Sequence, residues 1–148
     1  MNAIARTNKL LSMVEQQAAL LANAVPSTQA TLEAGFHLLF EQLLIAVVVE
    51  LADIEPSVTM SNELGELIDS NAPVNTSIRE LKQGLSTPGH WLQRWYQQRI
   101  ALLTKVVQVK PSDHQLIIST GDQADAYPNH RLLLTEVTDF IDQARELN

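Results

Sequence analysis

The sequence predicts an all-α protein, arranged as an antiparallel bundle of four main helices. Short helical pieces are expected between the second main helix and a tryptophan-rich one. Apolar residues recur at helical spacing in several segments. One segment, residues 31–53, is apolar on nearly every side, and such a helix is normally enclosed by others. Successive helices of one chain usually pack antiparallel in such a bundle. The length of 148 residues suits a single domain, 1–148.

The first main helix is expected over residues 3–25, where apolar residues follow near-heptad spacing. Pro26 ends it. The second is expected over residues 28–53, capped by Ser27 or Thr28 and stopped by Pro56. Its few polar residues require an explanation inside a bundle. They are Glu33, His37, Glu41, Gln42 and Glu50.

Two short helical pieces are predicted in the stretch that follows the second main helix. The first lies near residues 62–69. The second begins at Ser77-x-x-Glu80, which resembles a capping box, and Gly84 would close it. Thr87 and Pro88 then predict the start of a third main helix over residues 87–109. Its apolar arc holds Trp91, Leu92, Trp95, Tyr96, Leu102, Leu103 and Val106. The Trp91, Trp95 and Tyr96 stripe suits a protein core or a homodimer contact.

Residues 111–128 are expected to form an irregular connector, with a short extended piece or small hairpin at residues 115–120 as the alternative. The fourth main helix is expected over residues 130–146, with Asn129 as its cap. Its apolar positions are Leu133, Val137, Phe140, Ile141 and Ala144.

Composition excludes several functions. The net charge of −7 and the lack of a basic run argue against nucleic acid and anionic membranes as partners. The absence of cysteine excludes thiol nucleophiles, disulfides and cysteine-based metal sites. Residues 36–52 contain four polar side chains, so we expect a buried soluble helix rather than a membrane span. Without a signal peptide pattern, a cytoplasmic location is expected.

Three polar residues form a row on the second helix. Glu33, His37 and Glu41 lie at i, i+4 and i+8, which places them on one face. Such a row can bind a divalent metal, although the Glu-x-x-His motif of dimetal bundles is absent. The alternative is that Glu33 lies near the exposed first turn while His37 and Glu41 form hydrogen bonds inside the bundle. A hydrolase whose water is activated by His37 and Glu41 is a further possibility.

Arg99 falls near the middle of the apolar arc of helix 87–109, so it must find an anion or reach water. We expect a structural buried pair of Arg99 with Glu41 or Glu50, which would fix the register of two helices. In the alternative, Arg99 faces a cavity and clamps an anionic ligand. That ligand-binding pocket would lie beside the central helix, lined by His37, Glu41, Trp95 and Arg99.

The opening Arg6-Thr7-Asn8-x-Leu10, the enclosed second helix and the tryptophan-rich helix resemble a family of short, uncharacterised, all-helical proteins from gammaproteobacteria. The resemblance covers most of the chain. It implies a helical fold for a domain of unknown function and assigns no activity. Within it, we expect Arg6 and Asn8 to tie the first helix to a neighbour by hydrogen bonds.

Four common enzyme signatures are absent from the sequence, namely the dinucleotide, P-loop, nucleophile-elbow and zincin motifs. The leading hypothesis is therefore a non-enzymatic cytoplasmic protein without a cofactor, acting as a protein–protein interaction module or homodimer. The alternative is a small-ligand-binding or metal-binding helical bundle.

Overall fold

The computed structural model describes residues 2–54, 63–107 and 129–147, and every regular element within these ranges is an α-helix. The helices are α1 (Ala3–Ala22), α2 (Pro26–Ala52), α3 (Leu64–Asn71), α4 (Thr76–Ser86), α5 (Trp91–Val107) and α7 (His130–Leu147). The all-helical class and the short helical pieces before α5 are thus confirmed. The predicted strand or loop at residues 111–128 lies outside the described residues.

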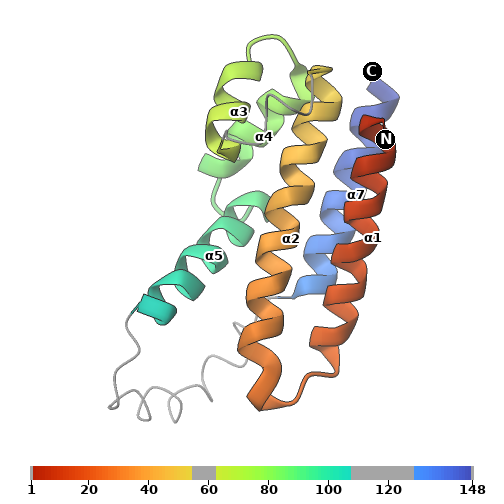
Figure 1. The fold of residues 1–148 in the computed structure, drawn as a ribbon. Coiled ribbons are helices and arrows are strands. Elements are labelled where there is room, and N and C mark those ends of the chain that lie inside the picture. The colour runs from red at the N-terminus through yellow and green to blue at the C-terminus, as the bar shows by residue number, and fades with distance from the viewer. Residues whose placement is uncertain (1, 55–62, 108–128, 148) are drawn as a thin grey trace.

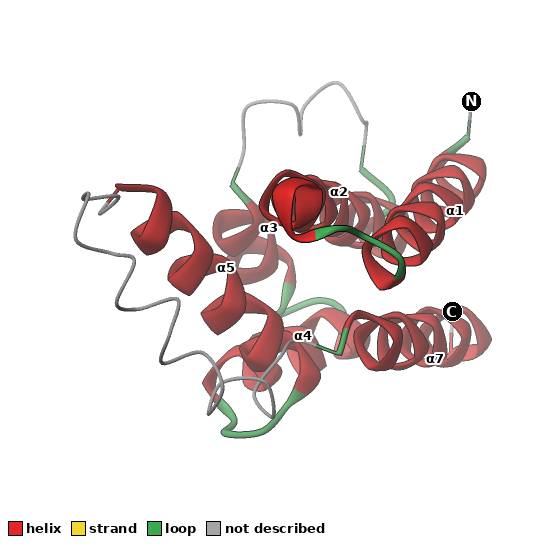
Figure 2. Ribbon diagram, turned by 90° about the horizontal axis from the view of Figure 1, so that it is seen from below, coloured by secondary structure: helices red, strands yellow, loops and turns green. Residues whose placement is uncertain are grey.

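Helices α1, α2 and α7 lie side by side (Figures 1 and 2). Helix α1 runs in the opposite direction to α2, and α7 lies against both. Helices α3 and α4 pack near the end of α2, and α5 leans away from the three long helices. The regular antiparallel arrangement of four main helices stays a prediction.

Helix α2 forms the centre of the core, as its continuous apolar sequence predicts. Every residue from Leu43 to Val49 is buried, and so are Phe36, His37 and Phe40. Burying a leucine-sized side chain stabilises the fold by roughly 2 kcal/mol. Because α2 is buried on so many sides, its apolar side chains stabilise the packing of the helices around it. By length and composition α2 could also cross a membrane, but 56% of its most apolar stretch is buried inside the fold. The core helix of a soluble protein meets the same criterion, so a cytoplasmic location stays a prediction.

The two tryptophans belong to this core. Trp91 and Trp95 are 8% and 1% exposed. The Trp95 ring lies 5.3 Å from that of Phe40, and the Trp91 ring 5.9 Å from that of Phe140. Tyr96, by contrast, is 44% exposed. The core interpretation of the tryptophans is confirmed, while a homodimer contact through the tryptophan pair stays a prediction.

Pro26 and Pro88 do not lie where the sequence predicts relative to the starts of the helices. Pro26 does not merely end the first helix: α1 stops at Ala22, and Pro26 begins α2 with no side-chain cap. Proline suits that position because its fixed φ and missing N–H cost nothing there. Pro88, expected to begin the third main helix, lies in a turn instead, and α5 starts at Trp91.

The local reason is that Thr87 serves the preceding helix. Its hydroxyl donates a hydrogen bond to the Gln83 carbonyl (2.7 Å), and Gly89 follows at φ +82°. A positive φ interrupts any helix. His90 then caps α5, because its Nδ1 accepts from the Leu92 N–H at 3.1 Å.

The capping prediction for α4 was also wrong, whereas that for α7 was right. Asn75, not Ser77, caps α4: its side chain accepts from the Ile78 N–H at 3.0 Å. Gly84 lies inside that helix rather than closing it. Asn129 accepts from the Leu132 N–H at 3.0 Å and caps α7 as predicted. An asparagine side chain in this role contributes about 1 kcal/mol.

Candidate functional site

Three potential ligand groups meet where α7 begins. Glu33 and His37 lie one turn apart on α2, and His130 is the first residue of α7. One donor atom from each of the three residues lies within 4.8 Å of the other two. Their position follows from the packing of α7 along α2, which brings together residues more than ninety positions apart in the chain.

His37 is the most unusual member of this group. It is only 3% exposed, yet neither ring nitrogen has a hydrogen-bond partner among the described residues. Burial, with smaller effects from the charges of His130 and Arg99, lowers the pKa of His37 from 6.5 to about 4. At neutral pH the imidazole is therefore uncharged and carries one lone pair available for a ligand.

His130 shares this environment. Burial lowers its pKa to about 4 as well, and its Nε2 is buried with no described partner. The His37 and His130 rings lie 6.3 Å apart, and the edge of Phe36 packs on His130 at 4.4 Å. The Phe36 ring therefore restricts how far the His130 imidazole can turn. Both histidines are present at pH 7 as neutral imidazoles, the form that binds metals.

The indole of Trp95 borders the same region. Its ring lies 6.5 Å from that of His37, and its Nε1–H is buried without a described acceptor. A buried polar atom without a partner costs roughly 1–3 kcal/mol. Native proteins contain few such atoms, so several in one place call for a specific explanation.

A pocket of about 240 Å³ reaches this region from the surface. Its walls come from the end of α1, the start of α2 and the start of α7. They are formed by Ala18, Leu21, Ala22, Gln29, Asn129, His130 and Arg131. The α1 side is apolar, whereas the opposite side carries amide, imidazole and guanidinium groups. His130 belongs both to the pocket and to the cluster, so the pocket lies next to one member of the cluster, whereas Glu33 and His37 do not line it.

The predicted pairing of Arg99 is confirmed for Glu41. The Arg99 guanidinium lies 2.9 Å from the Glu41 carboxylate, and the two side chains are 32% and 22% exposed. The pair is therefore half-buried, not fully buried. Glu41 forms an ion pair with Arg99, and the described group of close donor atoms contains His130 beside Glu33 and His37. Metal binding by the row Glu33, His37 and Glu41 stays a prediction.

Glu50 pairs with a different arginine from the one expected. Arg145 of α7 donates two hydrogen bonds to its carboxylate, at 2.8 and 2.9 Å, and a third to Asn8 at 3.0 Å. Burial alone raises the pKa of Glu50, but hydrogen bonds from Arg145 and Thr7 and the charge of Arg145 outweigh burial and lower it overall. Glu41 and Glu50 are nine residues apart, about 13 Å along a helix, so Arg99 cannot serve both.

This network ties three helices together. It joins Asn8 of α1, Glu50 of α2 and Arg145 of α7. The expectation that Asn8 bonds α1 to a neighbouring helix is thereby confirmed. Its place at the end of the bundle opposite the histidines, with no atom among the described buried polar atoms that lack a partner, indicates a structural role.

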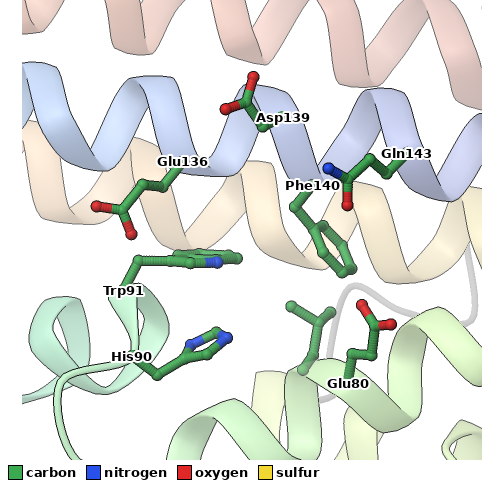
Figure 3. A pocket seen from close by; sticks show the side chains of 8 residues that line it. Glu80, His90, Trp91, Glu136, Asp139, Phe140 and Gln143 are labelled. Atoms are coloured by element: carbon green, nitrogen blue, oxygen red, sulfur yellow. The ribbon is translucent and has the colours of Figure 1, made fainter.

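A second pocket, of about 270 Å³, opens between α4, the start of α5 and α7 (Figure 3). Trp91 and Phe140 lie between His90 and Glu80 on one side and Glu136 on the other. Glu136 is bound by the Arg94 guanidinium. Among the described residues that line it, none has a buried polar atom without a partner. This pocket therefore lacks the feature that distinguishes the His37 region.

The chain was also compared with known proteins. A model of a family of unknown function, DUF6586, matches residues 1–148. The chain belongs to this family. Neither the curated proteins nor the solved structures contain a match. Membership in DUF6586 confirms the resemblance to a helical family without an assigned activity, while the gammaproteobacterial origin stays a prediction. For this DUF6586 chain, the site must therefore be argued from its own geometry.

The predicted ligand-binding set is only partly assembled. His37 and Trp95 are neighbours, and Arg99 is close enough for its charge to affect His37. Arg99 and Glu41, however, bind each other, and neither lines the two pockets described above. Sequence reasoning missed His130 because its spacing from His37 has no periodic relation. The available signal was its position at the start of a helix that must pack on α2.

Proposed function

We propose that this protein is a ligand-binding helical bundle whose site is the His37 region, reached through the pocket beside His130. The observation that carries the proposal is that His37 is 3% exposed with both ring nitrogens unpaired among the described residues. An apolar side chain of similar size would avoid this desolvation cost. The burial of a polar imidazole at this position is explained if His37 gains its partner only when a ligand binds.

The ligand is small. The pocket volume of about 240 Å³ admits a metal ion with its water or a compact organic molecule, but not a folded domain. Its apolar α1 wall and its polar wall around His130 suit a ligand with one polar end.

Native mass spectrometry of the protein purified without chelator tests this proposal. We expect an added mass on the wild-type chain that is lost in His37→Leu, which replaces the imidazole by an apolar group of similar size. Glu50→Gln, at the opposite end of the bundle, serves as the control and should keep the added mass. A wild-type chain of bare mass that also shows no thermal shift with a panel of metals and metabolites would reject ligand binding.

A second candidate function is a non-enzymatic cytoplasmic interaction module, acting as a homodimer or through a protein partner. It is favoured by an apolar row on α5, formed by Tyr96, Ile100 and Leu103, which are 44%, 44% and 50% exposed. These residues recur at i, i+4 and i+7, so they share one helix face. Sedimentation at increasing concentration tests it: a dimer that becomes monomeric in Ile100→Glu would support the module, and a strict monomer would refute the homodimer.

A further inference from the structure

We propose that Glu33, His37 and His130 bind a divalent transition-metal ion, with zinc as the best match. The inference rests on the proposed function, because it names the ligand of the same site. It is carried by the convergence of three donor atoms within 4.8 Å of one another, on two helices that pack together.

The ligand types favour zinc. Two imidazoles and one carboxylate form the set that holds zinc in several hydrolytic enzymes, whereas calcium and magnesium require oxygen ligands. Neither Glu33 nor His37 needs a new backbone position, since residues four apart on a helix lie on the same face. A tetrahedral zinc ion with bonds of about 2.1 Å holds its ligand atoms about 3.4 Å apart. Binding therefore draws the donor atoms together by at most about 1.4 Å, which small changes in the side-chain torsion angles can supply.

The buried state of His37 is an observation independent of this convergence. Both of its ring nitrogens lack a partner among the described residues, so one is available to a metal without breaking an existing hydrogen bond. The same holds for Nε2 of His130. Phe36 packs against the rings of both histidines, at 5.6 and 4.4 Å, which limits their rotation before the metal binds.

The bound ion would keep one position open. Three protein ligands leave the fourth position of a tetrahedral zinc ion for water or an exogenous group. The pocket formed by Ala18, Leu21, Gln29 and Arg131 also contains His130, so a water or small ligand in this pocket would lie beside one of the three ligand residues. The site thus has the coordination of an accessible zinc centre, in contrast to a structural one closed by four protein ligands.

Cobalt titration of the tag-free, chelator-treated protein tests the metal site, because Co²⁺ replaces zinc and its visible absorption reports tetrahedral coordination. We expect one Co²⁺ per chain, displaced by zinc. The Glu33→Gln and His130→Gln variants should each weaken binding by more than roughly 100-fold. Two matched controls, His90→Gln and Glu66→Gln, remove a histidine and an exposed glutamate outside the cluster and should leave the titration unchanged.

Circular dichroism of each variant establishes that it is folded. Glu33→Gln changes a half-buried side chain and keeps its size. Absence of Co²⁺ and Zn²⁺ binding by the wild-type chain would overturn the metal site. Undiminished binding by folded Glu33→Gln and His130→Gln would overturn it equally. If native mass spectrometry instead finds an organic mass that depends on His37, the ligand-binding function stands and only the metal assignment fails.

Discussion

Acidification should destabilise the metal-free protein through His37, and the effect should disappear in His37→Leu. The pKa of His37 is lowered by burial to about 4 in the folded state, against 6.5 for an ordinary histidine. Between these values the unfolded chain binds a proton that the folded chain does not. Stability is therefore fully present above pH 6.5 and is lost as the pH falls toward 4.

The magnitude follows from these two pKa values. At pH 5 an unfolded histidine is almost fully protonated, whereas the folded His37 is about nine-tenths neutral. The difference lowers the free energy of unfolding between pH 7 and pH 5 by about 2 kcal/mol. His130 changes stability in the same direction, because burial lowers its pKa to about 4 as well.

Urea denaturation at pH 7 and pH 5, with chelator present throughout, measures this effect. The wild-type chain should lose at least about 2 kcal/mol on acidification. The His37→Leu variant should lose about 2 kcal/mol less than the wild type over the same interval. An identical pH dependence in the two proteins would refute the conclusion that His37 is buried as a neutral imidazole.

Three further changes test packing and ion pairs elsewhere in the fold. Gly84→Ala should destabilise the protein by roughly 1–3 kcal/mol in spite of alanine's helix propensity, because its Cβ would overlap the His90 imidazole. Adding His90→Ala should restore stability in a double-mutant cycle. If Gly84→Ala alone leaves stability unchanged, the contact between residues 84 and 90 is contradicted. Arg145→Met should cost about 2 kcal/mol in urea denaturation, since it leaves the largely buried Glu50 carboxylate unpaired, and an unchanged midpoint would argue against the network. Arg99→Met should cost about 1 kcal/mol or less because its ion pair is half-exposed, and a loss above 3 kcal/mol would show that the pair is buried more deeply.

Periodicity predicted the helices well because burial dictated the pattern. The continuous apolar run of residues 43–49 can only be enclosed, and the structure encloses it. The ends of the helices were predicted less well because capping depends on the turn that precedes each helix. Thr87 could cap α5 or close α4, and the glycine at position 89 decided the outcome by its positive φ.

Of the three residues in the candidate site, the sequence predicted Glu33 and His37 but not His130. Residues on one helix have a spacing that can be read directly, which is why Glu33 and His37 were identified together. A partner from another helix depends on the register of packing, which local spacing does not contain. For the same reason the pairing of Arg99 with Glu41 was anticipated as one of two choices, while Arg145 was missed as the partner of Glu50.

Among the described residues His37 has no hydrogen-bond partner, and we propose that it binds a ligand together with His130. The ¹⁵N resonances of the two imidazole rings, recorded before and after adding one equivalent of Zn²⁺ at pH 7, test it most directly. We expect neutral rings in the free protein and a coordination shift of one nitrogen in each ring after zinc is added. Unshifted His37 and His130 nitrogens at saturating zinc would contradict the metal site, and a charged or hydrogen-bonded His37 ring in the free protein would contradict the claim itself.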